Sequence, residues 1–367
     1  MIAPKPPLPA RALDDRVFAG VAAATLLAFA AVALWPGLSG YRVNIIGQLA
    51  CFALLAVALD LIWGYAGILS LGHGLFFAIG GYVAGMHLLE HAVATTGVTP
   101  DIVQFMGWTA LPAWWAPLGS FPVALLAAVA VSFGAAFAFG WVSFRSRVGG
   151  VYFAIITQAL VYVAMLLMFR NDTGFGGNNG MTGFQTIFGV PFQSPSVATG
   201  LALASLGALG VTLVGCRLLM VGRFGRLLVA TRDDEIRLRS LGYDTLRLKL
   251  AVWCLSAVIA AIAGLLYVPQ VGIINPRVLS PELSLEIAVW CAIGGRGRLA
   301  GAVIGAVLVN AIKFSLSATL PELWPFVLSG LVILVALIFP NGLLDIGRWR
   351  PALLSRPGAL RPQDAAS

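Results

Sequence analysis

Long apolar runs separated by short polar segments dominate the chain. A helix needs about 20 apolar residues to cross the hydrocarbon core of a bilayer. Ten runs predict such helices, with nine or eight as alternatives, over residues 17–35, 43–63, 68–89, 120–144, 150–169, 198–219, 250–268, 283–295, 299–317 and 324–340. The eighth run is too short to cross alone. We expect either a half-helix there or a helix that starts earlier, within GIINPRVLSPELS.

The composition supports a membrane protein. Hydrophobic residues make up 59% of the 367 residues and charged residues only 10%, and the mean hydropathy is +0.93. Soluble domains usually contain about 25% charged residues, so much of this chain must face lipid. The 42 glycines, including Gly-x-x-x-Gly spacings within residues 80–85 and 301–305, favour close helix packing. The expected fold class is therefore an all-α polytopic membrane protein.

The basic residues are distributed unevenly between the loops. With the N-terminus placed inside, 19 of the 23 Lys and Arg residues fall on the inner side, and only Arg42, Arg170 and Arg277 fall outside. The positive-inside rule then predicts that both termini are cytoplasmic, and it explains the net charge of +8 better than nucleic-acid binding does. The expected organisation is a cytoplasmic tail over 1–16, a transmembrane region over 17–340 with a cytoplasmic loop at 220–249, and a cytoplasmic tail over 341–367.

The cytoplasmic loop is the most distinctive segment. Residues 211–250 hold eight Lys and Arg residues beside Asp233, Asp234 and Glu235. We expect a short helix from about Asp233 to Leu241, with an aspartate at its start and Gly242 at its end. Mixed charges of this kind favour docking on a protein partner, whereas anchoring to anionic lipids is the alternative. The candidate docking residues are Arg232, Asp233, Asp234, Glu235, Arg239 and Gly242, and the helix has a weak apolar face of Ile236, Leu238 and Leu241.

Residues that could support catalysis or bind a metal are scarce. The four cysteines lie in or beside apolar runs without a CxxC pair, which is typical of structural thiols. His87 and His91 are four residues apart but have no evident third ligand. Ser70 and His73 lack a nucleophile-elbow sequence and a partner acid, so satisfied polar packing is the better interpretation. We therefore expect no catalytic residue and no metal site.

A path for a neutral solute would need polar side chains within the helices. Few ionisable groups occur there, namely Asp60, Glu286 and Lys313, which argues against ion-driven transport. The candidate pathway residues are Gln48, Thr157, Gln158, Asn178, Asn179 and Asn310. Hydrogen bonding between helices is the alternative role for each of the side chains within the helices.

Two long loops are predicted to face outward. Residues 91–120 contain Trp108, Trp114 and Trp115, which favour an interfacial aromatic belt over a docking surface. Residues 170–197 contain a Gly/Asn-rich run, which predicts either a tight structured turn or a vestibule for the solute.

Four blocks of sequence carry a resemblance to a known family. They cover residues 59–86, 144–184, 230–276 and 287–310. The chain resembles the permease subunits of bacterial ATP-binding-cassette importers of the branched-chain amino-acid type. The segments RNDTGFGGNNG and YVPQVGIINP look like the urea-transport branch. The family's Glu-Ala-Ala-like loop is matched by Glu235 and Gly242, whereas Arg237, Leu238 and Arg239 replace its small residues.

The resemblance implies a subunit of the bacterial inner membrane that binds no cofactor itself. Its implied partners are a second, homologous permease, two cytoplasmic ATPases that use ATP and Mg²⁺, and a periplasmic solute-binding protein. The expected cargo is urea or a short amide. The alternatives are a branched-chain or other amino acid carried by the same architecture, and more remotely a passive channel for small neutral solutes or a membrane-embedded enzyme.

Overall fold

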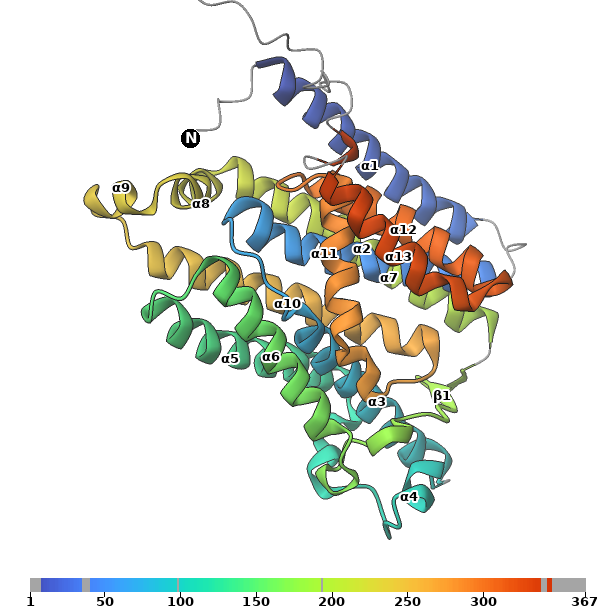
Figure 1. Ribbon diagram of the computed structural model, residues 1–367. Coiled ribbons are helices and arrows are strands. Elements are labelled where there is room, and N and C mark those ends of the chain that lie inside the picture. Colours follow the sequence, from blue (N-terminus) through green and yellow to red (C-terminus); the bar gives the residue numbers. More distant parts are fainter. Residues whose placement is uncertain (1–7, 35–39, 98, 193, 338–341, 345–367) are drawn as a thin grey trace, which may run out of the picture.

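The computed structural model describes residues 8–34, 40–97, 99–192, 194–337 and 342–344. The described residues form a bundle of long helices with short helices and a hairpin at its two ends (Figure 1). The long helices are α1 (Leu8–Leu34), α2 (Gly40–Asp60), α3 (His73–Thr96), α5 (Phe121–Arg145), α6 (Gly150–Met168), α7 (Pro195–Val221), α10 (Thr245–Val271) and α12 (Leu299–Thr319). Two shorter helices of 14 residues each, α11 (Pro281–Gly294) and α13 (Trp324–Leu337), complete the bundle.

The short elements lie between these helices. A π-helical turn (Leu61–Tyr65) continues α2, and α8 (Arg223–Asp233) and α9 (Glu235–Ser240) connect α7 to α10. At the opposite end lie α4 (Asp101–Phe105), four 3₁₀ turns (Ala113–Gly119, Asn171–Thr173, Gly177–Asn179 and Pro276–Leu279) and a hairpin of β1 (Thr186–Ile187) and β2 (Val190–Pro191). A further 3₁₀ turn (Pro321–Leu323) precedes α13.

Helix α2 lies at the centre of the bundle. It packs against α7, α10, α11 and α12, and its residues 54–58 are fully buried. Its residues 49–59 are apolar on every face, which is the composition expected of a helix surrounded by other helices or by lipid. Helices α5, α6 and α7 instead expose large apolar side chains such as Leu126, Tyr152 and Val211. These outer helices therefore present the surface that faces lipid.

Glycines permit the closest helix contacts. A Cβ atom on Gly80 would lie 1.9 Å from the carbonyl oxygen of Ala261, and one on Gly305 would lie 2.0 Å from that of Trp290. These positions join α3 to α10 and α12 to α11, so any side chain there would separate the helices. The packing role predicted for the Gly-rich segments 80–85 and 301–305 is confirmed.

Seven described helices are long and apolar enough to cross a membrane, starting at Asp14, Gly40, Phe121, Gly150, Pro195, Thr245 and Leu299. The predicted count of ten is therefore not confirmed. Helices α11 and α13 would each extend only about 21 Å, less than the core of about 30 Å. The eighth predicted span is thus a short helix, as expected, preceded by a separate turn at Pro276–Leu279.

Two predicted boundaries need correction. Helix α3 begins at His73 rather than at residue 68, because residues 66–72 form a non-helical connection held by a hydrogen bond from the backbone of Leu71 to Thr157. Helix α1 begins at Leu8, so the predicted tail 1–16 is partly helical. The predicted tail 341–367 lies outside the described residues except for 342–344.

Basic residues gather at the end of the bundle that carries α8 and α9. There Arg298 pairs with Asp14 at 3.2 Å, Arg217 pairs with Asp15, and the carboxylate of Asp60 accepts a hydrogen bond from the backbone of Gly297 at 2.7 Å. Helix α4 and the hairpin lie at the opposite end (Figure 1). The separation of charge predicted from the loops is present in space, and its assignment to the cytoplasm remains a prediction.

The two long loops that are predicted to face outward pack against each other through aromatic rings. Trp115 is fully buried and contacts Trp108 and Trp114, while Trp114 contacts Phe175 of the second loop. The prediction of an interfacial aromatic belt is therefore wrong for Trp115, which belongs to a local core.

The Gly/Asn run in the second loop folds into a turn with left-handed glycines. Gly176 has φ 83° and Gly180 has φ 68°. The next residue, Met181, exchanges backbone hydrogen bonds with Ile274 at 2.8 and 3.0 Å. A tight structured turn was one of the two predicted alternatives, and this geometry supports it.

Candidate functional site

Helices α8 and α9 form a projecting element at the basic end of the bundle (Figure 1). They meet at Asp234, whose backbone is extended and whose carboxylate accepts a hydrogen bond from the backbone of Arg237 at 3.0 Å. Gly242 follows the end of α9 in a left-handed conformation, with φ 85°. The predicted short helix with an aspartate cap and a terminal glycine is confirmed, although the cap is Asp234 and α9 starts at Glu235.

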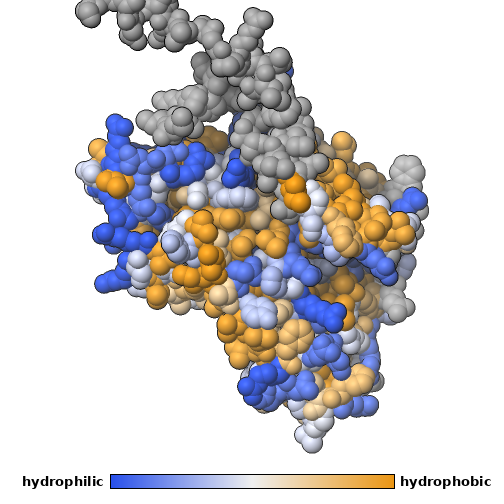
Figure 2. Space-filling view, viewed as in Figure 1, coloured by the Kyte–Doolittle hydropathy of each residue, from blue (hydrophilic) through white to orange (hydrophobic). Residues whose placement is uncertain are grey.

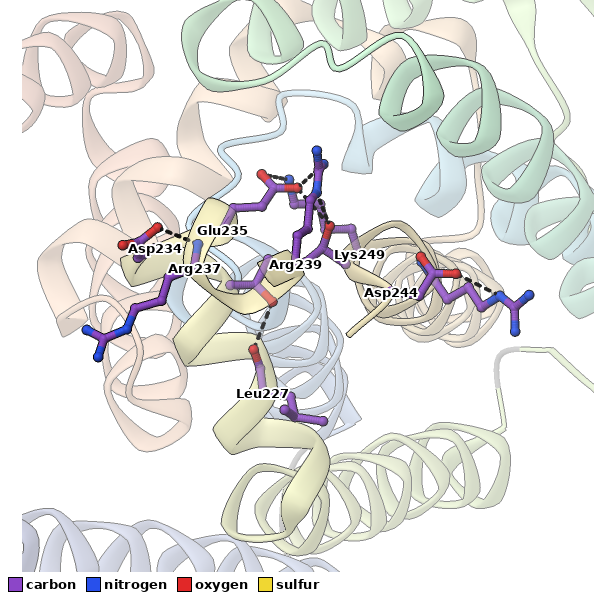
Figure 3. A network of polar contacts seen from close by, with 10 residues as sticks. Leu227, Asp234, Glu235, Arg237, Arg239, Asp244 and Lys249 are labelled. Atoms are coloured by element: carbon purple, nitrogen blue, oxygen red, sulfur yellow. Dashed lines mark hydrogen bonds and ion pairs between the residues drawn. The ribbon is translucent and has the colours of Figure 1, made fainter. Parts of the chain in front are cut away.

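Glu235 joins α9 to α10. Its carboxylate contacts Arg239 and Lys249, each at 2.5 Å, and accepts a hydrogen bond from Thr245 at 3.0 Å (Figure 3). Partial burial raises the pKa of Glu235, but the hydrogen bond and charge of Lys249, aided by Thr245 and Arg239, outweigh it and hold that pKa below its usual range. Glu235 is therefore ionised at neutral pH and anchors α9 to the start of α10.

Arg232 connects α8 to the rest of the bundle. Its guanidinium donates a hydrogen bond to the backbone oxygen of Gly64 at 2.8 Å and pairs with Asp233 at 3.2 Å. Gly64 lies in the π-helical turn that continues the central helix α2. A displacement of α8 would therefore act directly on the end of α2.

The outer surface of α9 differs from the predicted apolar face. Leu238 is buried, whereas Ile236 and Leu241 are 79% and 69% exposed. Arg237 points away from the Glu235 network (Figure 3). Leu238 thus packs inward, and Ile236 and Leu241 are the apolar side chains left on the exposed surface. The predicted docking residues that are exposed beside them are Arg232, Asp233, Asp234, Arg239 and Gly242. Of the predicted docking residues, Glu235 and Arg239 bind to each other and to α10.

The predicted pathway residues are dispersed. Thr157 is buried and bonds the backbone of Leu71, and Asn310 is buried with its amide donating to the backbone oxygen of Ala306 at 2.9 Å. Gln48 is partly buried on α2, and the amide of Gln158 on α6 has no hydrogen-bond partner among the described residues. Asn178 and Asn179 are exposed in the outer turn. The six residues therefore lie on four elements, and their role in transport stays a prediction.

A polar pocket that the sequence did not reveal lies between α2, α3, α10, α11 and α12. Its volume is about 250 Å³. Glu286 is 4% exposed and binds Lys313 through both carboxylate oxygens at 2.8 Å, and the indole of Trp324 donates to it at 3.0 Å. The lining residues are Phe52, Phe77, Tyr267, Asn275, Arg277, Val278, Ser280, Glu282, Leu283, Glu286 and Lys313. None of the six predicted pathway residues lines it.

The signal for this pocket was present in the sequence. Opposite charges on two consecutive apolar helices, Glu286 and Lys313, are costly unless they meet. Their pairing depends on how α11 and α12 pack, which no local pattern reveals.

The histidines and cysteines have structural partners or are buried. His73 bonds Ser256 at 3.2 Å, and His87 bonds the backbone oxygen of Leu118 at 2.7 Å. Ser70 instead accepts a hydrogen bond from the backbone of Gly72. The four cysteines are buried and free. Within the described part of the chain, no group of three or more candidate ligands could hold a metal ion.

Known proteins provide an independent comparison. The family model described as "Branched-chain amino acid transport system / permease component" matches residues 41–337. The chain is 28% identical over 364 residues to the high-affinity branched-chain amino acid transport system permease protein LivM of Salmonella typhimurium, with 93% of this chain and 78% of that protein covered. It is 29% identical to LivM of Escherichia coli over 354 residues, covering 90% and 76% of the two chains.

A second group of relatives is named for the import of another cargo. The autoinducer 2 import system permease protein LsrC of Yersinia enterocolitica is 28% identical over 262 residues, covering 68% of this chain and 69% of that protein. No solved structure matches. Since the family model covers most of the chain and the described helices include seven candidate membrane spans, this is a multi-pass inner-membrane protein. The chain belongs to the family of permease components of branched-chain amino acid transport systems.

Proposed function

We propose that this chain is one permease subunit of an ATP-driven importer whose cargo is a branched-chain or similarly apolar amino acid. Support comes from the two LivM relatives, which match over 90% or more of this chain and are named for amino-acid transport. The urea-branch resemblance comes from two segments, and Met181, which directly follows the first of them, pairs with Ile274 of the second. No relative named here transports urea, so we place the amino acid first and keep urea as the competing cargo.

The proposed complex contains three kinds of partner. A second permease subunit completes the translocation pathway, two cytoplasmic ATPases supply the energy, and a periplasmic binding protein delivers the cargo. In this proposal ATP and Mg²⁺ bind to the ATPases, and the chain contributes the coupling element and half of the pathway.

The arrangement of α8 and α9 is the observation that carries the proposal. Ile236 and Leu241 are exposed on a projecting helix, as expected of a surface that a partner covers. Glu235 anchors the same helix to α10 through Lys249, and Arg232 anchors α8 to Gly64. A partner that moved α9 would therefore move two central helices, which is the mechanical coupling that an ATP-driven permease requires.

Reconstitution with the partner subunits tests the function. Proteoliposomes containing this chain, its partner permease and the ATPases are supplied with the loaded binding protein, and uptake of labelled leucine and labelled urea is measured in parallel. We expect ATP-dependent accumulation of leucine and no accumulation of urea. Accumulation of urea alone would reverse the choice of cargo, and failure to accumulate either with unstimulated ATP hydrolysis would reject the importer.

Substitutions on α9 distinguish a coupled importer from a passive channel. Ile236→Asp places a charge on the exposed apolar surface, and we expect uptake and stimulated ATP hydrolysis to be lost while the chain still inserts into the membrane. Leu320→Asp is the matched control, because Leu320 is also exposed but lies at the opposite end of the bundle. Solute flux that is unaffected by Ile236→Asp and does not require ATP would favour the channel.

A further inference from the structure

The polar pocket between α11 and the central helices combines charge with an aromatic floor. Tyr267 contacts both Phe52 and Phe77, with ring centroids 5.1 and 5.2 Å apart, and all three residues line the pocket. Phe52 and Phe77 are buried, so the floor is formed by the core itself. Concave sites with apolar walls and a few polar groups are the usual form of small-molecule sites.

The charged residues of the pocket have two different roles. Both oxygens of Glu286 accept hydrogen bonds from Lys313, and one also accepts from Trp324. This pair therefore forms one side of the pocket and already has its ionic partners. Arg277 and Glu282 are exposed, and among the described residues neither side chain has an ion-pair partner. The pocket therefore presents one uncommitted positive group and one uncommitted negative group beside the aromatic floor.

The position of these groups argues against contact with lipid. Figure 2 shows hydrophilic residues in the middle of this face, over the lower end of α11, with hydrophobic surface on either side. Ionisable groups at membrane depth are costly next to hydrocarbon and usually face a bundle interior or a water-filled path. Glu286 and Lys313 lie within apolar helices, so the wall that they form fits a solute pathway better than a lipid-facing surface. Arg277 and Glu282 lie exposed at the mouth of this pocket.

We propose that the pocket binds the zwitterion of a free apolar amino acid. Its carboxylate binds the guanidinium of Arg277, its ammonium group binds Glu282, and its side chain rests on Phe52, Phe77 and Tyr267. This inference rests on the proposed function and adds a binding site within the permease itself. Arginine matches a carboxylate with two parallel hydrogen bonds, which gives the pocket a preference for carboxylate-bearing solutes.

The size and charge of the pocket favour this class over other solutes. A volume of about 250 Å³ suits a small molecule. Urea is neutral and would leave Arg277 and Glu282 without ionic partners and the aromatic floor uncovered. An amino acid with an aliphatic side chain would satisfy all three parts at once.

Direct binding to the assembled transporter tests the site without the binding protein. The complex of both permeases and the ATPases is placed in lipid nanodiscs without ATP, and binding of tritiated leucine is measured with and without Arg277→Gln. We expect Arg277→Gln to weaken leucine binding about tenfold or more, since a hydrogen-bonded ion pair is lost. Arg42→Gln removes the same charge from an exposed residue outside the pocket and should leave binding unchanged.

Ligands that lack one charge assign the contacts. Leucinamide has no carboxylate, so it should compete poorly and should be insensitive to Arg277→Gln, whereas Glu282→Gln should weaken both leucine and leucinamide. Arg277→Lys should restore part of the affinity for leucine, because it restores the charge without the two parallel bonds.

Three results would overturn the site. The first is equal leucine binding by the parent and Arg277→Gln complexes, and the second is an equal loss in Arg277→Gln and Arg42→Gln. The third is loss of the partner permease from the purified Arg277→Gln complex, which would make the pocket a subunit contact. Failure of the parent to accumulate leucine in proteoliposomes would instead reject the proposed cargo, and the binding measurement would still decide whether the pocket recognises a zwitterion.

Discussion

Two ion-paired carboxylates in this protein have similar partners but different surroundings. Glu235 on α9 pairs with Lys249 and Arg239 at the water-exposed end of the bundle, with its side chain 29% exposed. Glu286 on α11 pairs with Lys313 inside the bundle, with its side chain 5% exposed. The two lysines are both partly exposed, so the difference lies in the carboxylates. Water and salt screen the charge of Glu235, whereas the nearly buried carboxylate of Glu286 depends on its partners for stabilisation. Breaking the two pairs should therefore cost very different amounts of folding free energy, although their contact distances are similar.

Breaking the buried pair should have the largest effect. Lys313→Met leaves the Glu286 carboxylate buried without its cation, and such losses cost about 3–5 kcal/mol. We expect a large fall in the thermal stability of the purified transporter, measured as the midpoint of loss of the monodisperse complex on heating. The double variant Glu286→Gln/Lys313→Met should recover much of the loss, because no uncompensated charge remains. Equal midpoints for parent and Lys313→Met would contradict this assignment.

Removing the anchor of α9 should have a smaller effect on stability. Glu235→Gln removes the ion pairs with Lys249 and Arg239 and should cost about 1 kcal/mol, since partly exposed pairs contribute little. Its effect on coupling should be larger, because α9 loses its link to α10. We expect the ratio of leucine transported to ATP hydrolysed to fall. An unchanged ratio would mean that the contacts of Glu235 have no role in coupling.

Acidification should weaken the ion pairs that Glu235 makes with Lys249 and Arg239. The pKa of Glu235 is lower in the folded protein than its ordinary value of 4.5, so its stabilising contribution is complete above that value and is lost as the pH falls through the lowered pKa. The difference in thermal midpoint between the parent and Glu235→Gln should therefore shrink below about pH 4.5. A difference that stays constant down to pH 3 would show that ionisation of Glu235 is not involved.

The smallest effect is expected at a more exposed ion pair in the same loop. Arg247 and Asp244 pair at 2.9 Å, but the Arg247 side chain is 85% exposed. Arg247→Gln should change stability by less than about 0.5 kcal/mol. A change in stability as large as that caused by Glu235→Gln would mean that solvent exposure does not determine how much each ion pair contributes to stability.

Local patterns predicted the parts of this fold that depend on local chemistry. Apolar runs located the long helices, and Asp234 and Gly242 located the ends of α9 because capping needs only neighbouring residues. The burial of the Leu238 side chain could not be predicted from a short charged segment, since it depends on what packs beneath α9. The pairing of Glu286 with Lys313 likewise depends on the arrangement of α11 and α12.

The predicted pathway residues illustrate the same limit. Thr157 bonds the backbone of Leu71 and Asn310 donates to its own helix, and these contacts leave the predicted role of both residues in the pathway untested. The sequence predicts Arg277 only as a charge outside the helices and predicts no role for Glu282, which precedes the run 283–295. Only the packing of α11 against α2 and α3 places them at a pocket.

Our proposal places α9 in contact with the ATPase on the cytoplasmic side, and crosslinking in inner-membrane vesicles can detect that contact. A photoreactive residue at Ile236 and, as a control, one at Leu320 are activated in the assembled transporter, and the crosslinked partners are identified by mass spectrometry. We predict a crosslink from position 236 to the ATPase subunit and none from position 320. A crosslink from position 236 to the periplasmic binding protein, or to the ATPase from position 320 alone, would contradict the account.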